Sequence, residues 1–188
     1  MKAKVSWVDG MRFMGTSGTG HSVVMDAKFE DRAPSAASPM EHVLLALGGC
    51  SSIDVVEILR KKRQPFTGVE VELDADRRAE PPRVFTKVKL MFVVRGTGVS
   101  EAAVKQAVDL SMEKYCSVAA TLKAGGVEVA YGSRVEGDGE GFDAPGAQKP
   151  VMPGSLEVPR PAPHPEADLP FPSRPGHEGR REGADGGS

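Results

Sequence analysis

The sequence lacks the features that mark zinc proteins, membrane proteins and secreted proteins. Only 2 of its 188 residues are cysteines, 66 positions apart, without the Cys-x-x-Cys or His-x-x-x-His spacing of a zinc site. The longest uncharged apolar run, residues 43–53, is shorter than the ~18 residues of a membrane span. The basic N-terminus is not followed by an apolar stretch, so we expect no signal peptide. We therefore expect a cytoplasmic protein with no cofactor, no metal and no membrane partner.

Strong charge of one sign is also missing. The formal net charge is −2, of which residues 134–188 contribute −4, with 6 basic and 10 acidic side chains, leaving +2 for residues 1–133. A nucleic-acid-binding surface needs a strongly basic field, so no nucleic-acid partner is expected. Pro and Gly make up 20 of the 55 residues in 134–188, which is typical of disorder. We expect a folded domain at 1–133 and a disordered Pro/Gly-rich tail at 134–188.

The first 133 residues contain both alternating and helical apolar patterns. Apolar residues at every second position predict strands at residues 3–7, 11–13, 21–27, 69–74 and 84–94. The capping box Ser38-Pro39-Met40-Glu41 predicts the start of a long helix. Ser100 predicts the cap of a second helix, followed by a short helical segment and a last strand at 127–131. This order predicts an α+β fold with antiparallel sheets around a long buried central helix.

The predicted central helix is apolar or small on nearly every side from Val43 to Ile58. Such a helix is expected only where protein covers it all round, and two hairpins supply too little cover. We therefore expect an obligate homodimer. Gly48 and Gly49 each cost about 1 kcal/mol relative to alanine in a helix interior. Their presence indicates that another element approaches the helix backbone closely, or that the helix bends there.

Cys50 and Cys116 are the candidates for chemistry. Cys50 lies among small residues in the middle of the long helix, where Asp54, one turn on, disfavours a thiolate unless a cation intervenes. Cys116 joins the end of one helix to the start of the next, and a helix N-terminus favours a thiolate. Two interpretations stay open. The thiols are inert core residues, or they are an attacking and a resolving cysteine whose Cα atoms come within about 7 Å.

Other polar residues have a simpler structural interpretation. Glu41 stands where a capping box favours Glu, and nine residues place it roughly 14 Å from Cys50 on the opposite side of a straight helix. It can serve a thiol site only across an interface or through a bend. Packing, turn or surface roles account for His21, His42, the Gly15-x-x-Gly18-x-Gly20 segment, and Arg77, Arg78 and Arg83.

Three segments together resemble the OsmC/Ohr family, and more narrowly its YhfA-like branch: Ser38-Pro39-Met40-Glu41, residues 46–55 around Cys50, and residues 113–118 around Cys116. The resemblance implies an intertwined homodimer and a thiol peroxidase that reduces organic and fatty-acid hydroperoxides. On this model Cys50 becomes a sulfenic acid, Cys116 resolves it as a disulfide, and a dithiol of the lipoyl type is the reductant. Glu41 then acts across the subunit interface. The alternative is a redox-responsive or small-ligand-binding protein of the same fold with little turnover.

The chain departs from the family pattern at two places. The family's peroxidases have Pro-Glu where this chain has Pro39-Met40, which moves the carboxylate one position to Glu41, about 100° around the helix. The family's catalytic arginine lies in the N-terminal strands, where this chain has Arg12 and then Arg32 in contexts that do not match. We expect a thiol pair without an arginine to be poorly activated.

Overall fold

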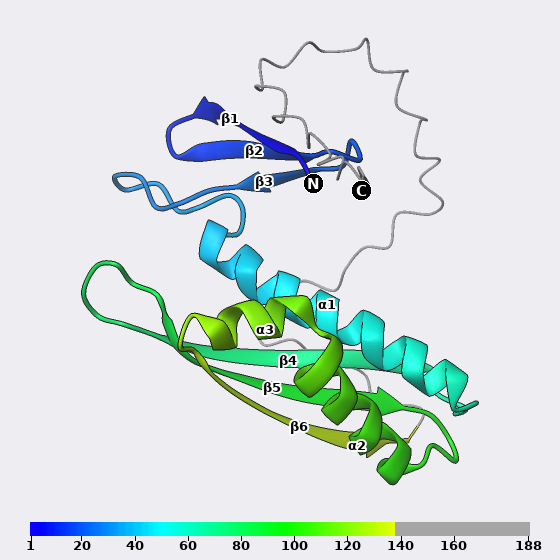
Figure 1. The fold of residues 1–188 in the computed structure, drawn as a ribbon. Coiled ribbons are helices and arrows are strands. Elements are labelled where there is room, and N and C mark those ends of the chain that lie inside the picture. Colours follow the sequence, from blue (N-terminus) through cyan, green and yellow to red (C-terminus); the bar gives the residue numbers. More distant parts are fainter. Residues whose placement is uncertain (138–188) are drawn as a thin grey trace, which may run out of the picture. The chain divides into compact units, whose positions relative to one another are not determined.

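A computed structural model describes residues 1–137 of the chain (Figure 1). Its elements are, in order, β1 (Ala3–Asp9), β2 (Arg12–Ser17), β3 (Ser22–Met25), α1 (Pro39–Lys61), β4 (Gly68–Arg77), β5 (Phe85–Arg95), α2 (Glu101–Leu110), the π-helix η1 (Ser111–Tyr115), α3 (Ser117–Ala124) and β6 (Glu128–Glu136). This order confirms the α+β fold class predicted from the sequence. The π-helix was not predicted. The disorder predicted for the tail lies outside the described residues from position 138 onward.

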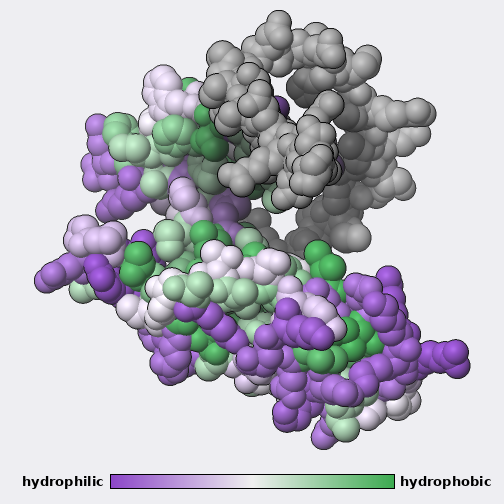
Figure 2. All heavy atoms as spheres, in the orientation of Figure 1, coloured by the Kyte–Doolittle hydropathy of each residue, from purple (hydrophilic) through white to green (hydrophobic). Residues whose placement is uncertain are grey.

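The N-terminal strands form a three-stranded antiparallel sheet in the order β1-β2-β3. Gly10 opens the turn between β1 and β2 with a φ of 45°, a conformation that glycine adopts without steric cost, and its carbonyl accepts a hydrogen bond from the Trp7 indole at 2.8 Å. Large apolar side chains are nevertheless exposed on this sheet, including Val5 at 60% and Trp7 at 66%. Figure 2 shows apolar residues at its surface. The sheet therefore has no core of its own.

The start of α1 has the geometry that the capping box predicts. The Ser38 backbone N–H donates to Glu41 Oε2 at 2.7 Å, and the Glu41 N–H donates to Ser38 Oγ at 3.3 Å. Arg60 and Lys61 occupy the last turn, where cations stabilise a helix. By length and a mean hydropathy of 1.6 alone, α1 also resembles a membrane span. The central helix of a folded domain has the same two properties, so this likeness is weak evidence of insertion.

The second sheet has the order β4-β5-β6, and one pairing differs from the expected antiparallel arrangement. β4 and β5 form the predicted hairpin, but β6 runs parallel to β5. The physical reason is the connection: α2, η1 and α3 cross the sheet between the two strands, so the chain re-enters it in the direction of β5. The three α-helices lie on one face of this sheet (Figure 1).

The core lies between this sheet and the helices. Every second residue of β5 from Val88 to Val94 is buried, as the alternating pattern predicts. These side chains pack with Leu47, Val55 and Leu59 of α1 and with Val104, Ala107 and Val108 of α2.

β6 ends at Glu136, beyond the predicted strand and beyond the predicted domain boundary at residue 133. Its last residues form ion pairs across the sheet, which explains the extension. Arg134 contacts Glu72 at 2.9 Å and Glu136 at 2.7 Å, and Glu136 also lies 3.4 Å from Arg95. Residues 134–136 therefore belong to the folded part of the chain and not to the tail.

α1 is buried on one side only. Leu47, Val55 and Leu59 are 0% exposed, whereas Leu45 is 61% and Ile53 is 70% exposed. On the buried side, a Cβ at Gly48 would lie 3.0 Å from Leu73 Cδ1, so this glycine lets the helix approach β4 closely, as its position predicted. A Cβ at Gly49 would meet nothing within 4 Å. The sheet and the other helices thus cover one face of the central helix and leave an apolar face open.

Candidate active site

Cys50 lies in the middle of α1, at the border between its two faces. The residue is partly buried and packs against the core cluster to which Cys116 belongs. Its neighbours Gly48 and Ser51 are buried, whereas Gly49 is exposed. Cys50 is therefore attached to the core and still within reach of the open side of the helix.

Cys116 stands at the junction of η1 and α3 and is only 3% exposed. Its backbone N–H donates to the Ser111 carbonyl at 2.8 Å, which closes the π-helical turn. Its sulfur caps α3 by accepting a hydrogen bond from the Ala119 N–H at 3.5 Å. The local sequence thus fixes this thiol from both sides.

The structure brings the two thiols together. Burial raises the pKa of the Cys116 thiol to about 11, the Ala119 and Val118 N–H groups oppose this shift, and the neighbouring Cys50 thiol adds to it. The expectation that the helix N-terminus favours a Cys116 thiolate was therefore wrong, because removal from water outweighs one hydrogen bond at the start of α3. Cys116 is a neutral thiol at pH 7 and belongs to the cluster against which Cys50 packs.

A small polar cluster lies beside the thiols, where α1 meets η1. The Ser111 hydroxyl is buried and lies 3.0 Å from Asp54 Oδ2 and 3.2 Å from the Ser51 carbonyl oxygen. The Ser51 hydroxyl donates within its own helix, to Leu47 O at 2.8 Å or Gly48 O at 3.1 Å. Among residues 1–137, Asp54 forms no ion pair with an arginine, so the cation that the sequence called for is not supplied by this part of the chain.

Sequence reasoning did not single out Ser111 as a site residue. It continues the apolar spacing of α2 and stands between buried residues. The signal was a hydroxyl in an otherwise apolar stripe, because a buried hydroxyl requires a hydrogen-bond partner.

Glu41 is exposed at the start of α1 and forms the capping box already described. Hydrogen bonds from the Ser38 side chain and backbone lower the pKa of the Glu41 carboxyl, which is therefore ionised at pH 7. Within this chain Glu41 and Cys50 are at different positions of one helix and the structure does not bring them together. The capping role is the one that its contacts show.

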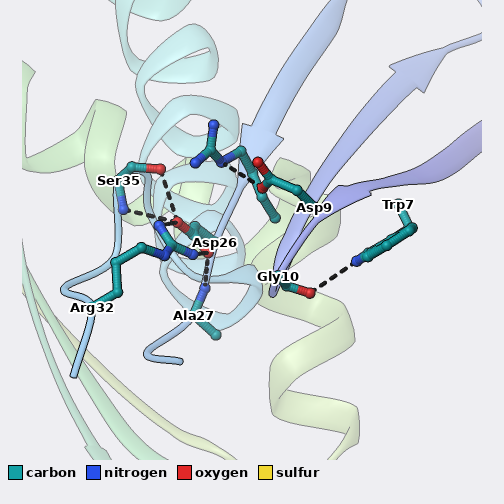
Figure 3. Close-up of polar contacts among 8 residues, drawn as sticks. Trp7, Asp9, Gly10, Asp26, Ala27, Arg32 and Ser35 are labelled. Atoms are coloured by element: carbon teal, nitrogen blue, oxygen red, sulfur yellow. Dashed lines mark hydrogen bonds and ion pairs between the residues drawn. The ribbon is translucent and has the colours of Figure 1, made fainter. Parts of the chain in front are cut away.

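The N-terminal arginines pair with nearby aspartates (Figure 3). Arg32 contacts Asp26 at 2.9 and 3.1 Å, and Asp26 also accepts hydrogen bonds from the Ser35 N–H and hydroxyl at 2.9 and 2.8 Å. These contacts, with Arg32 first, hold the pKa of the Asp26 carboxyl far below its ordinary value. Arg12 Nε lies 3.4 Å from Asp9 Oδ1. Arg32 is thus engaged by a buried carboxylate within its own segment.

The remaining candidates have local partners. His21 Nδ1 lies 3.1 Å from Thr19 Oγ1, and the His42 ring lies 3.0 Å from the Ser38 carbonyl. Arg77 donates to the Arg83 carbonyl across the β4–β5 turn at 2.8 Å. The structure describes no cluster of three or more metal-ligating side chains within residues 1–137.

Two grooves lie near the helices. The larger, of about 740 Å³, runs between α2 and β6 and is not lined by either cysteine. A second, of about 600 Å³, lies between α1 and Tyr115 and includes Asp54, Ile58 and Leu110. This second groove begins one helical turn from Cys50 and directly beside Cys116 in the sequence.

Comparison with known proteins agrees with these features. Residues 31–131 match the family model described as OsmC-like protein. Protein YhfA of Escherichia coli (strain K12) is 54% identical over 123 residues, which is 65% of this chain and 90% of YhfA. A crystal structure of a hypothetical protein from Aquifex aeolicus VF5 is 30% identical, with a TM-score of 0.63 over 73% of this chain and 96% of that one.

A more distant structure shows how far the fold extends. The crystal structure of an organic hydroperoxide resistance protein OsmC from Legionella pneumophila superposes with a TM-score of 0.52 at 17% identity, over 71% of this chain and 94% of that one. At this identity the likeness shows a shared fold only. The matched family model and the 54% identical YhfA show that this chain belongs to the OsmC/Ohr family, in its YhfA-like branch.

Proposed function

We propose that this protein is a cysteine-based peroxidase that reduces organic hydroperoxides in defence against oxidative stress. The observation that carries the proposal is the pair of free thiols, Cys50 and Cys116, which come from two different segments of the chain and lie in one packed cluster. An inert core needs no such pair, whereas a two-step thiol reaction does. Membership of the OsmC/Ohr family supports the same chemistry.

The environments of the two thiols assign their roles. Cys50 is partly exposed, so a hydroperoxide reaches it first, and its thiolate attacks the outer peroxide oxygen. The O–O bond breaks, Cys50 becomes a sulfenic acid, and the alkoxide takes a proton and leaves as an alcohol. Cys116 is buried and neutral, and it then displaces the hydroxyl group from Cys50. The S–S bond forms, the S–O bond breaks, and water leaves with the Cys116 proton.

A dithiol completes the cycle by thiol–disulfide exchange, and is itself oxidised to a disulfide while both cysteines are reduced. We expect a reductant of the lipoyl type and a cytoplasmic location, where thiols are kept reduced. Leu44 and Leu47 belong with Cys50 to one apolar cluster, and Ile53 is exposed three positions further along α1; these apolar side chains favour an alkyl hydroperoxide over hydrogen peroxide.

A homodimer belongs to this proposal. Leu45, Gly49 and Ile53 recur every four residues on the open face of α1, and an apolar face with a glycine at its centre favours a closely packed helix. A second copy of the same helix supplies such a cover. In that arrangement the ionised Glu41 of one chain is available to the thiol site of the other.

The alternative function is a redox-responsive or small-ligand-binding protein with little turnover. The absence of an arginine partner for Asp54 among residues 1–137 favours it, because a nearby carboxylate without a cation opposes formation of a thiolate.

Activity of two single variants tests the proposal. With cumene hydroperoxide and a lipoyl dithiol, Cys50→Ser should abolish peroxide consumption, whereas Cys116→Ser should allow one turnover and leave a sulfenic acid that dimedone traps. Ser52→Ala, two positions from Cys50 on α1, is the matched control and should keep full activity. If both cysteine variants behave like the wild type, or if the wild-type thiols stay free in excess hydroperoxide, the peroxidase proposal fails and the alternative function replaces it.

A further inference from the structure

Ser111 connects the surroundings of the two cysteines directly. Its carbonyl accepts the Cys116 N–H at 2.8 Å, and its hydroxyl lies 3.2 Å from the carbonyl of Ser51, the residue after Cys50. The same hydroxyl lies 3.0 Å from Asp54 Oδ2, one turn further along α1. A single buried residue therefore joins the backbone at Cys116 to the turn of α1 that carries Cys50.

The local backbone makes this connection possible. Ser111–Tyr115 is a π-helical turn between α2 and α3, and it contains one more residue than an α-helical turn. The additional residue changes the direction in which the following residue, Cys116, leaves the helix by about 100°. Apolar packing alone is non-directional and tolerates small sliding of one helix on another. Hydrogen bonds from Ser111 to α1 are directional and oppose such sliding.

We propose that Ser111 is a positioning residue, which aligns Cys116 with Cys50 for disulfide formation through its hydrogen bonds to Asp54 and Ser51. The proposal rests on the function proposed above and extends it to the second step of the reaction. That step requires alignment because a disulfide forms only when the Cβ atoms come within about 3.5–4.5 Å with the proper torsion. The first step, attack on the peroxide, involves Cys50 alone and does not require this alignment.

The step itself needs no further reactant. The Cys116 sulfur forms the S–S bond as the S–O bond of the Cys50 sulfenic acid breaks, and the released hydroxide combines with the Cys116 proton as water. Ser111 takes no part in this transfer. It acts only on the distance and orientation of the two sulfur atoms.

Two measurements on Ser111→Ala test the proposal. In a glutathione redox buffer, the equilibrium constant for the Cys50–Cys116 disulfide should fall about tenfold, because the thiols are less well aligned. After a single addition of cumene hydroperoxide, sulfenic acid should form at the wild-type rate, but its conversion to disulfide should slow about tenfold. Asp54→Ala, which removes one of the two partners of the hydroxyl, should shift both readings in the same direction.

Ser117→Ala is the matched control, since Ser117 is an exposed serine next to Cys116 and the change should leave both readings at wild-type values. Wild-type disulfide formation in a folded Ser111→Ala protein would overturn the proposal. If Ser111→Ala does not fold, Asp54→Ala decides in the same way. The glutathione measurement involves no peroxide. A wild type that forms the disulfide in glutathione buffer but does not react with hydroperoxides thus contradicts the proposed function alone. A wild type that forms no disulfide in either experiment contradicts both the proposed function and the role of Ser111.

Discussion

Two neighbouring thiols of this protein differ in how much water surrounds them, and this difference divides their chemistry. Cys116 is 3% exposed and its raised pKa of about 11 keeps it protonated under physiological conditions. A protonated thiol reacts slowly with peroxide, since the thiolate is the nucleophile. The same thiol still completes a disulfide once Cys50 beside it carries a good leaving group.

The Cys116 pKa also predicts how stability depends on pH. The thiol ionises near its ordinary value of 9.0 in the unfolded chain and at about 11 in the folded one. Between these values the unfolded state has lost a proton that the native state keeps, so the free energy of unfolding falls as the pH rises, by on the order of 2 kcal/mol. Cys116→Ser retains an oxygen to cap α3 and lacks this titration.

Urea unfolding of reduced wild type and Cys116→Ser at pH 8 and pH 10.5 measures the effect. The wild type should lose more stability than the variant between the two pH values, because all other titrating groups are common to both. Equal losses of unfolding free energy in the wild type and in Cys116→Ser would show that burial does not raise the pKa of Cys116.

Glu41 offers a test of capping against chemistry. Glutamine also fits the third helical position of a capping box, so Glu41→Gln should change the free energy of unfolding by less than about 0.5 kcal/mol. Glu41→Ala should cost about 1 kcal/mol. If Glu41 acts on the thiol site of a second chain, Glu41→Gln should also lower the rate of hydroperoxide reduction about tenfold. Full activity of a stable Glu41→Gln protein would leave capping as its only role.

At the scale of elements, α1 has two different faces. One face packs on β4, with Gly48 at the point of closest approach to Leu73, and the other carries the exposed Leu45 and Ile53. The helix pattern of the sequence predicted the element and its caps, because both depend on residues within a few positions. It did not predict which face the chain covers, because this depends on where the strands pack.

The contact at Gly48 predicts a coupled pair of substitutions. Gly48→Ala gains helix propensity but places a methyl 3.0 Å from Leu73 Cδ1, so it should lower the free energy of unfolding by about 1 kcal/mol. Leu73→Val shortens that side chain and should relieve the clash. Urea unfolding of the double variant should then show a smaller loss than the sum of the two single losses. Strict additivity would contradict the close approach of α1 and β4.

The π-helix and β6 show the limits of local patterns. The apolar spacing of α2 continues into Ser111 without a break, so η1 leaves no mark in the sequence. β6 is held at its end by Arg134 and Glu136, whose partners Glu72 and Arg95 are on other strands. Local sequence assigns such charged residues to a disordered tail, because it does not show the strands that carry their ion-pair partners.

At the scale of the whole molecule, the described part of the chain leaves much apolar surface uncovered. The N-terminal sheet exposes Val5, Trp7 and Phe13, and α1 exposes Leu45 and Ile53. Exposed apolar patches of this kind are rare on monomers and common at interfaces. The homodimer that the sequence predicted remains a proposal, and these surfaces support it.

Ile53→Lys tests the homodimer. A lysine in the middle of an apolar interface is left without a partner, so the variant should sediment as a monomer or aggregate at micromolar concentration, where the wild type should sediment as a dimer. Ala120→Lys places the same charge on the exposed side of α3 and should remain a dimer. A folded monomer for the wild type at these concentrations would show that the open face of α1 needs no second copy.

The sequence by itself determined the order of the helices and strands other than η1, the capping of α1 and the identity of the two cysteines as candidates. Each of these depends on periodicity or on hydrogen bonds between near neighbours in the chain, which local chemistry settles. Only the tertiary structure decided that Cys50 and Cys116 lie in one packed cluster, that burial outweighs the helix N-terminus at Cys116, and that β6 runs parallel to β5. It also decided that Ser111 links the two thiol-bearing segments. These features join residues between about 40 and 66 positions apart, and their energies arise from desolvation and directional contacts that exist only once the helices have packed on the sheet.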